Sequence, residues 1–278
     1  LEPQLKLIEF KKKGNRTRLP FKFPPPSALR RRVRACPYRV MNAHKTIMAK
    51  KKVGIMGGTF NPIHKIFLTA SGGPFYGKKV DFLRNVTLAD ALKHPNWLMG
   101  QKITIDCATM MNKGFEVIEA KWLFGVRPDQ IEVVVHPQSV IHSMVQFGDG
   151  AIKAQLGTPD MRLPIMYALT YPVRLPSSFE RIDWNTLKEL TFEKPDLELF
   201  PNLRHAYTAL AEGGNIPCVV NAANEICVAA FLEERIKFTD MPKLIERAME
   251  KATYILKPTL DDYLETDKEI RAMVKSWI

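Results

Sequence analysis

The stretch Ile103–Phe124, with the sequence ITIDCATMMNKGFEVIEAKWLF, constrains the fold of this chain more than any other. Its β-branched start, Ile103–Ile105, predicts a short buried strand. A turn of small residues follows over 106–109, and the remainder predicts an amphipathic helix. The apolar face of that helix would hold four residues, Met110, Phe115, Ile118 and Leu123. A strand, a tight turn and a helix in this order direct polar groups toward one point.

Four polar residues of this stretch predict an anion site beside a carboxylate. Cys107 and Asn112 would lie at or before the helix start, where free backbone N–H groups favour an anion. Lys113 adds a positive charge that can meet a phosphate. Glu116 follows one helical turn later on the same face. The pattern suggests a phosphorylated substrate beside a divalent metal, although the spacing also fits an ordinary solvated helix face.

Further blocks of sequence make this pattern specific. They are Ala70–Phe75 (ASGGPF), His94–Gly100 (HPNWLMG), His136–Phe147, Gln155–Ile165 and Asn221–Leu232. Together with the central stretch they resemble, in the same order, the 1-deoxy-D-xylulose 5-phosphate reductoisomerase family. The resemblance runs from about Lys65 to the C-terminus. It implies an enzyme of isoprenoid precursor synthesis that uses NADPH and Mg²⁺ or Mn²⁺.

The resemblance also implies roles for individual residues. Substrate binding would fall to Ser71, His94, Cys107, Asn112 and Lys113. Glu116 would be a catalytic metal ligand, His94 would also be catalytic, and Gly100 would lie near NADPH. The family normally has Ser where this chain has Cys107, and because a thiol is the weaker donor, weaker phosphate binding is expected.

The predicted fold class is α+β or α/β. A catalytic domain over 65–175 would hold a small sheet flanked by helices, and a connector over 176–202 would lead to an all-helical domain over 203–278. The resemblance implies a homodimer through the sheet around 131–156. No apolar run approaches the length of a membrane span, and four cysteines without a C-x-x-C pair indicate reduced thiols in the cytoplasm.

The pattern of the chain also predicts individual elements. β-branched or alternating runs predict three strands, 131–137, 140–147 and 151–156, with a hairpin turn over 148–150. A capping pair, Thr87 and Asp90, predicts a short helix. Five further helices are predicted, over 159–170, 203–212, 218–236, 242–256 and 267–278. His136 and His142 lie in predicted strands, where a single histidine is most often structural.

The first 64 residues do not take part in this resemblance. Residues 1–52 hold 16 of the 41 Lys and Arg residues but two of the 29 acidic residues, with six prolines, and predict a disordered tail. Three interpretations of this tail are open: foreign sequence, a targeting peptide, or an arm that binds acidic surfaces. Nucleic acid is the less favoured partner for such an arm. Residues 52–64, KVGIMGGTFNPIH, resemble the opening strand and loop of nicotinate-nucleotide adenylyltransferases. His64 matches the first histidine of their H-x-G-H motif, but the second is missing.

Two features of the reductoisomerase family have no counterpart here. Residues 1–64 do not match its dinucleotide-binding Rossmann domain, and no Asp-x-Glu metal pair precedes Ser71. The sequence therefore predicts the catalytic and C-terminal part of such an enzyme, truncated at its N-terminus, with little activity alone. The alternative is a non-catalytic dimerising protein on the same scaffold, with the basic tail as its binding arm.

Overall fold

The computed structural model describes residues 54–55, 58–59, 63–93 and 99–278. The predicted tail over 1–52 and the greater part of the 52–64 segment lie outside the described residues. Residues 52–278 form one compact unit. No helix among the described residues is long and apolar enough to cross a bilayer.

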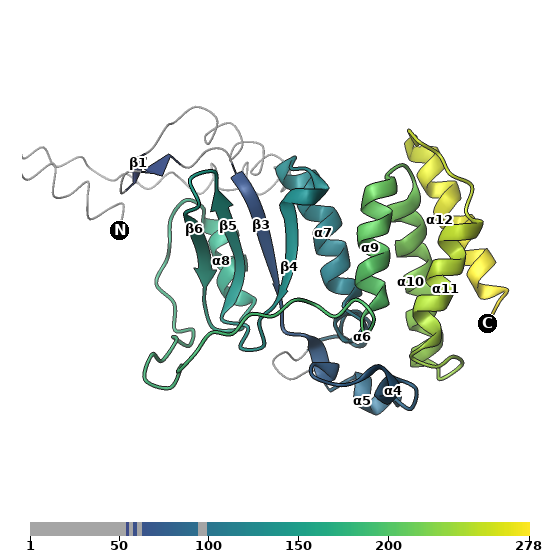
Figure 1. Ribbon diagram of the computed structural model, residues 1–278, viewed down its shortest axis with the longest axis horizontal. Helices are drawn as coiled ribbons and strands as arrows, with labels where there is room; N and C mark the ends of the chain where they lie inside the picture. Colours follow the sequence, from purple (N-terminus) through teal and green to yellow (C-terminus); the bar gives the residue numbers. More distant parts are fainter. Residues whose placement is uncertain (1–53, 56–57, 60–62, 94–98) are drawn as a thin grey trace, which may run out of the picture. The chain divides into compact units, whose positions relative to one another are not determined.

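The sheet of this unit has four strands in the order β4-β3-β5-β6 (Figure 1). They are β3 (Ile63–Ala70), β4 (Ile131–Val135), β5 (Ile141–Phe147) and β6 (Ile152–Leu156). β3 pairs in parallel with β4 and antiparallel with β5, and β5 pairs antiparallel with β6. The predicted strands and the hairpin turn before β6 are confirmed, and β3 begins two residues before Lys65, where the family resemblance was expected to start. A separate two-stranded pairing joins β1 (Gly54–Ile55) and β2 (Gly58–Thr59).

Short elements and two longer helices connect the parallel strands β3 and β4. They are η1 (Gly73–Phe75), α4 (Val80–Leu83), α5 (Leu88–Ala91), α6 (Gln101–Ala108), α7 (Met111–Phe124) and η2 (Pro128–Gln130). The predicted capping pair is present at α5, where Thr87 and Asp90 bond each other's backbone N–H groups. α7 contacts both β3 and β4.

The predicted strand at Ile103–Ile105 is wrong, because these residues lie within α6. Thr104 donates its hydroxyl hydrogen to the Gly100 carbonyl at 2.8 Å, as a helical threonine can. Ile105 and Ala108, three residues apart, are both fully buried. Burial of this helical face outweighs the strand preference of two isoleucines, since tertiary packing readily overrides local propensity.

The predicted apolar face of α7 is also corrected. Its buried residues recur every third position, at Met111, Gly114, Val117 and Ala120. Phe115 and Ile118 are partly buried at the margin of the core. A Cβ added at Gly114 would lie 2.6 Å from the Ala206 Cβ, so the backbone of α7 packs directly against the next layer of helices.

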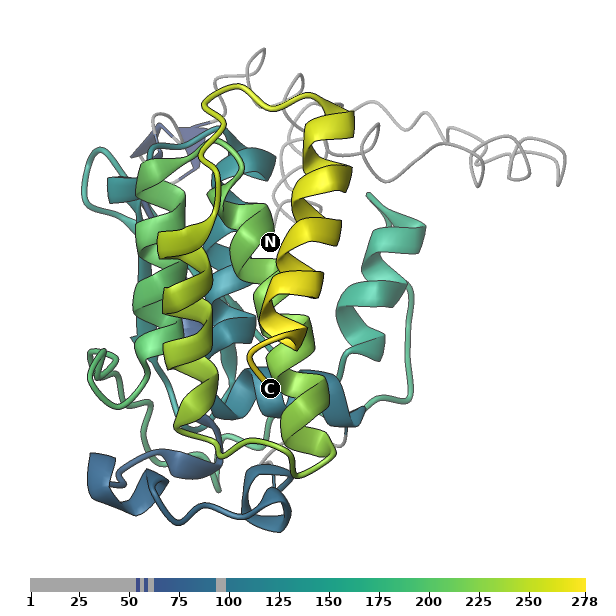
Figure 2. The ribbon, with the colours of Figure 1, turned by 90° about the vertical axis from the view of Figure 1, so that its right-hand side faces the viewer.

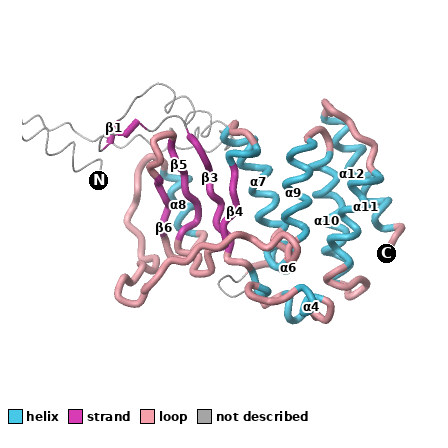
Figure 3. Tube along the Cα trace, viewed as in Figure 1, coloured by secondary structure: helices cyan, strands magenta, loops and turns pink. Residues whose placement is uncertain are grey.

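That layer consists of four helices after a long connector (Figure 3). They are α9 (Pro201–Glu212), α10 (Ile216–Leu232), α11 (Asp240–Lys251) and α12 (Leu260–Lys275). All four were predicted, although α12 begins seven residues before the predicted start at Asp267 and α11 ends before Leu256. Thr259 explains the early start, because its side chain accepts a bond from the Asp262 N–H.

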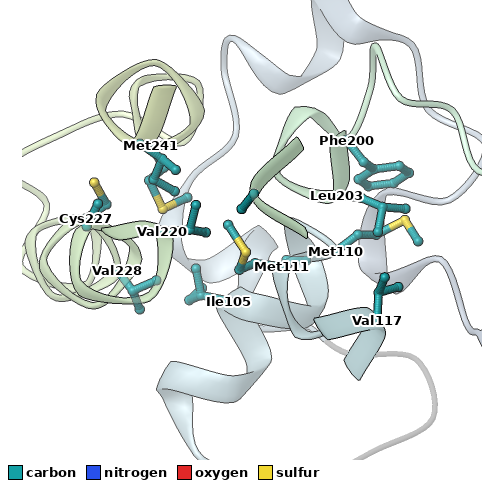
Figure 4. Packing of buried hydrophobic residues seen from close by; sticks show 14 of the residues in the cluster. Ile105, Met110, Met111, Val117, Phe200, Leu203, Val220, Cys227, Val228 and Met241 are labelled. Carbon is teal, nitrogen blue, oxygen red and sulfur yellow. The ribbon is translucent and has the colours of Figure 1, made fainter. Parts of the chain in front are cut away.

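One hydrophobic core joins the sheet to these helices. Figure 4 shows Ile105 and Met111 facing Val220 and Val228 of α10, with Leu203 of α9 nearby. The core therefore continues across the predicted boundary between the catalytic and the helical domain. The helix α8 (Arg162–Thr170), predicted from Pro159, has no buried residue and lies apart from α9–α12 (Figure 2).

Candidate functional site

The break between α6 and α7 places the polar residues of the central stretch. Cys107 is the penultimate residue of α6, so it lies before the start of α7 but inside a helix, and the turn predicted over 106–109 is wrong at this position. Met110 follows with φ 58°, a left-handed conformation that is uncommon for residues other than glycine. This turn starts α7 in a new direction, and Asn112 lies in its first turn as predicted.

Three side chains of α7 form a single hydrogen-bonded group. Asn112 Nδ2 donates to Glu116 Oε1 at 2.9 Å, and Lys113 Nζ lies 2.6 Å from Glu116 Oε2. The side chain of Lys113 is 12% exposed, whereas that of Glu116 is 37% exposed. A largely desolvated ammonium acts more strongly on a nearby anion than one in bulk water. The group is therefore more than an ordinary surface charge pair.

The turn after β3 approaches the same place from the sheet. Gly73 has φ 66°, and a Cβ there would lie 2.9 Å from the Cys107 carbonyl oxygen. The turn from Ser71 to Gly73 thus lies against the end of α6. The Ser71 Oγ accepts a hydrogen bond from the Gly73 N–H at 3.2 Å, which holds the hydroxyl oxygen against the backbone of this turn.

The Cys107 thiol is held in its neutral form. Burial raises its pKa to about 12, with Lys113 opposing that rise and with Asp106 and Glu116 adding to it. These interactions show that Cys107 shares the electrostatic environment of the group on α7. At neutral pH it presents a weak S–H donor.

His142 was predicted to be structural, but it lies close to this group. It lies on β5, and burial lowers its pKa, with Lys113 lowering it further and Glu116 raising it. The imidazole therefore belongs to the surroundings of Lys113 and Glu116. The alternating pattern of the strand did not predict that His142 lies near α7, because this proximity depends on how β5 and α7 pack. His136, in contrast, is fully buried and stacks on Phe192 with ring centroids 4.8 Å apart.

A buried carboxylate fixes the helix that carries Cys107. Asp106 Oδ1 accepts a bond from Asn224 Nδ2 at 2.8 Å, and Asp106 Oδ2 lies 2.7 Å from Lys102 Nζ. The Asp106 side chain is 3% exposed. Asn224 belongs to α10 and to the Asn221–Leu232 block of the sequence, so this contact ties α10 to the residue next to Cys107.

The remaining predicted site residues are not brought into this group. Gly100 is exposed at the start of α6, and His94 lies outside the described residues. Among the described residues, no cluster of three or more His, Cys, Asp or Glu side chains could hold a metal ion. Glu116 gives one carboxylate, and both of its oxygens already meet Lys113 and Asn112. This set alone does not fit a divalent cation, which takes several oxygen ligands.

Two family models match the chain. One is described as the 1-deoxy-D-xylulose 5-phosphate reductoisomerase C-terminal domain and matches residues 40–124. The other is described as the DXP reductoisomerase C-terminal domain and matches residues 156–273. The first match contains the α6–α7 stretch, and it begins before Lys65, where the resemblance was expected to start.

Curated relatives are similar over most of the chain. The 1-deoxy-D-xylulose 5-phosphate reductoisomerase of Bacteroides thetaiotaomicron is 61% identical over 224 residues, covering 81% of this chain and 57% of its own length. That of Lachnospira eligens is 59% identical over 214 residues. The chain belongs to the 1-deoxy-D-xylulose 5-phosphate reductoisomerase family. It spans little more than half the length of these relatives.

Solved reductoisomerase structures support the same family at the level of the fold. A DOX-P reductoisomerase in complex with NADPH, fosmidomycin and magnesium superposes with a TM-score of 0.74 at 42% identity. The superposition covers 77% of this chain and 55% of the chain in that structure. The Zymomonas mobilis enzyme in complex with NADPH gives a TM-score of 0.72 at 44% identity.

Proposed function

We propose that this chain provides the sugar-phosphate-binding part of a 1-deoxy-D-xylulose 5-phosphate reductoisomerase. The whole enzyme would rearrange 1-deoxy-D-xylulose 5-phosphate and reduce the product with NADPH, assisted by Mg²⁺ or Mn²⁺. The observation that carries the proposal is the nearly buried Lys113 ammonium, held by Glu116 and close to Cys107.

The residues around Lys113 suit the anionic end of a phosphorylated sugar. Lys113 supplies a positive charge, and the Asn112 amide and the Ser71 hydroxyl are neutral donors. Cys107 adds a weak donor that does not bring a competing negative charge. An anchored phosphate orients the remainder of the sugar, so that binding energy far from the reacting atoms supports the chemistry.

The described residues do not by themselves fit the metal and the reductant. Glu116 is the one carboxylate of the proposed site, and the described sheet has one parallel pair, β3 and β4, unlike a doubly wound dinucleotide fold. We therefore assign no rearrangement or reduction step to these residues. We expect the chain alone to bind the sugar phosphate and to leave NADPH largely unoxidised.

Isothermal titration calorimetry with 1-deoxy-D-xylulose 5-phosphate tests the binding. The Lys113→Ala variant should bind at least tenfold more weakly than the unchanged chain. The Lys121→Ala variant is the matched control, because Lys121 lies on the same helix over the Trp122 ring, and it should bind normally. Equal affinities for all three chains would contradict the proposed anion site. Robust oxidation of NADPH with Mg²⁺ would contradict the expected lack of activity.

We propose further that the chain forms a homodimer through β6 and α8. β6 is an edge strand and is exposed along nearly its whole length. Leu169 of α8 is 81% exposed and Ile165 is 52% exposed, and Ile152 of β6 is 54% exposed. An unpaired strand edge beside exposed apolar side chains favours pairing with a second chain.

Analytical ultracentrifugation tests the dimer. Leu169→Glu should shift the chain toward monomer, because it places a charge in the apolar surface of α8. Leu264→Glu is the control, since Leu264 is 62% exposed on α12 and should not alter the mass. A monomeric unchanged chain would rule out this dimer.

The described cysteines are free thiols, which supports the proposed cytoplasmic location.

A further inference from the structure

The connector between α8 and α9 crosses the carboxyl ends of the two parallel strands, β3 and β4 (Figure 1). Two backbone bonds hold it against β4. The Val135 N–H donates to the Glu193 carbonyl at 2.8 Å, and the Glu193 N–H donates to the Val135 carbonyl at 2.9 Å. Val135 is also the partner of Ala70, the last residue of β3. Glu193 is therefore one strand away from the point where the Ser71–Gly73 turn begins.

The residues just before Glu193 attach the connector firmly to the segment after β4. The Thr191 carbonyl oxygen lies 2.9 Å from His136 Nδ1. Gln138 Nε2 donates to the Thr191 hydroxyl at 2.9 Å, and the Thr191 N–H donates to Gln138 Oε1 at 3.3 Å. Phe192 stacks on the fully buried His136 ring. The connector at 191–193 is thus a fixed support, to which a neighbouring segment can be fastened.

Tyr76 joins the Ser71–Gly73 turn to this support. Gly72 has φ 85°, and a Cβ there would lie 2.9 Å from both Cβ and Cδ2 of Tyr76. The Tyr76 side chain therefore packs directly against the backbone of the turn. Its hydroxyl donates a hydrogen bond to Glu193 Oε1 at 2.5 Å. This bond raises the pKa of Tyr76 above its usual value, so the phenol remains a donor at neutral pH.

The turn needs such a support because of its composition. Gly72 and Gly73 both have positive φ, and glycine loses more conformational freedom on ordering than any other residue. A binding segment that is ordered before the ligand arrives loses less freedom on binding, so the ligand binds more tightly. A contact that fixes this turn can therefore strengthen binding without touching the ligand.

We propose that Tyr76 and Glu193 are positioning residues for the sugar phosphate, and that their hydrogen bond holds the Ser71–Gly73 turn in its binding conformation. This inference rests on the proposed function, in which the Ser71 hydroxyl is one of the donors to the phosphate. Tyr76 acts from outside the site, through the backbone of Gly72. Glu193 acts through Tyr76, from a connector that lies far along the chain.

Calorimetric titration of the full chain with 1-deoxy-D-xylulose 5-phosphate tests the pair. Tyr76→Phe keeps the ring on Gly72 and should weaken binding about three- to tenfold, as the net contribution of one hydrogen bond predicts. Glu193→Ala should cause a similar loss, whereas Glu193→Gln keeps an acceptor oxygen and should restore most of the affinity. The double variant Tyr76→Phe/Glu193→Ala should lose no more than the weaker-binding single variant. Glu189→Ala removes an exposed carboxylate from the same connector and should bind normally.

The sign of the effect at Glu193 separates hydrogen bonding from charge. If the carboxylate acted only through its negative charge, Glu193→Ala and Glu193→Gln would both bind the phosphate more tightly, and the proposal would fail. It also fails if Tyr76→Phe and Glu193→Ala lower the melting temperature but leave the affinity unchanged, since the pair would then be merely structural. Losses that add up in the double variant would show that the two residues act independently, which contradicts the proposal.

Hydrogen exchange without ligand distinguishes this inference from the proposed function. Backbone amides over 71–76, followed by mass spectrometry, should exchange faster in Tyr76→Phe and Glu193→Ala than in the unchanged chain, and at the same rate in Glu189→Ala. Equal exchange rates in all four chains would overturn the hold on the turn, whatever the affinities are. If the unchanged chain does not bind the sugar phosphate, the proposed function fails, and faster exchange in the two variants would still confirm that the pair fixes the turn.

Discussion

The contact between Asp106 and Asn224 gives the sharpest test of how the site is supported. The change is Asn224→Leu, which keeps the number and branching of the side-chain heavy atoms and removes the amide donor. Asp106 Oδ1 then loses its bond from Asn224 Nδ2, which is 2.8 Å long, inside a helix interface where water cannot replace it. The Lys102 ammonium remains on the other oxygen.

The expected loss follows from the charge and the burial of Asp106. A hydrogen bond to a charged group contributes about 1.5–3 kcal/mol, and an unpaired buried acceptor retains its desolvation cost. One gain opposes this loss, because Asn224 Oδ1 has no hydrogen-bond partner among the described residues and leucine removes it. We expect a net decrease in the free energy of unfolding of about 2 kcal/mol, or roughly 4–8 °C in melting temperature for a chain of this size.

Urea denaturation followed by circular dichroism measures this loss. Asn85→Leu is the control, since Asn85 is exposed and the change should stay within about 0.5 kcal/mol. The Asn224→Asp variant adds a pH dependence, because two buried carboxylates can share one proton at low pH but repel each other above it. The loss in free energy of unfolding caused by Asn224→Asp should therefore increase from pH 5 to pH 8. If Asn224→Leu is as stable as the unchanged chain, the Asp106 contact does not hold α6 in place.

Three further predictions follow from single contacts. Cys107→Ser should tighten sugar-phosphate binding a few fold in calorimetry, because a hydroxyl replaces a neutral thiol; unchanged binding would remove Cys107 from the site. Gly114→Ala should lower the free energy of unfolding by about 1–3 kcal/mol in urea denaturation, through overpacking against Ala206. Gly157→Ala, where a Cβ would meet only an ordinary contact at 3.8 Å, should be neutral. The pKa of His142 is lowered in the folded state, so the unfolded chain takes up this proton more readily. The free energy of unfolding should therefore fall as the pH drops below the unfolded pKa of about 6.5. His142→Gln should reduce this fall between pH 7 and pH 5.5, as measured by urea denaturation at each pH.

Much of the fold follows from local patterns that the structure confirms. The capping pair at Thr87 and the hairpin turn over 148–150 depend on interactions within a few residues. The C-terminal helices follow from apolar spacing over ten or more residues. Their ends were predicted less well, and Thr259 shows why, since a single capping side chain decides where α12 begins.

The candidate site was predictable only in part. Asn112, Lys113 and Glu116 lie three and four residues apart on one helix, so their meeting is a local property. The turn that holds Ser71 is distant in sequence from Cys107, and the two are near each other because Gly73 packs against the end of α6. His142 was missed because it arrives on a third element. His94 stays a prediction, since it lies outside the described residues.

The sequence by itself determined the helical spacing of the anion-binding group, the strand order along the chain and the family. Tertiary structure decided that Ile103–Ile105 is helical, which face of α7 is buried, and that Asp106 is held by Asn224. The physical reason is the range of the forces involved. Hydrogen bonds and side-chain spacing within a helix are set by neighbours in sequence, whereas burial depends on which distant surface each element meets.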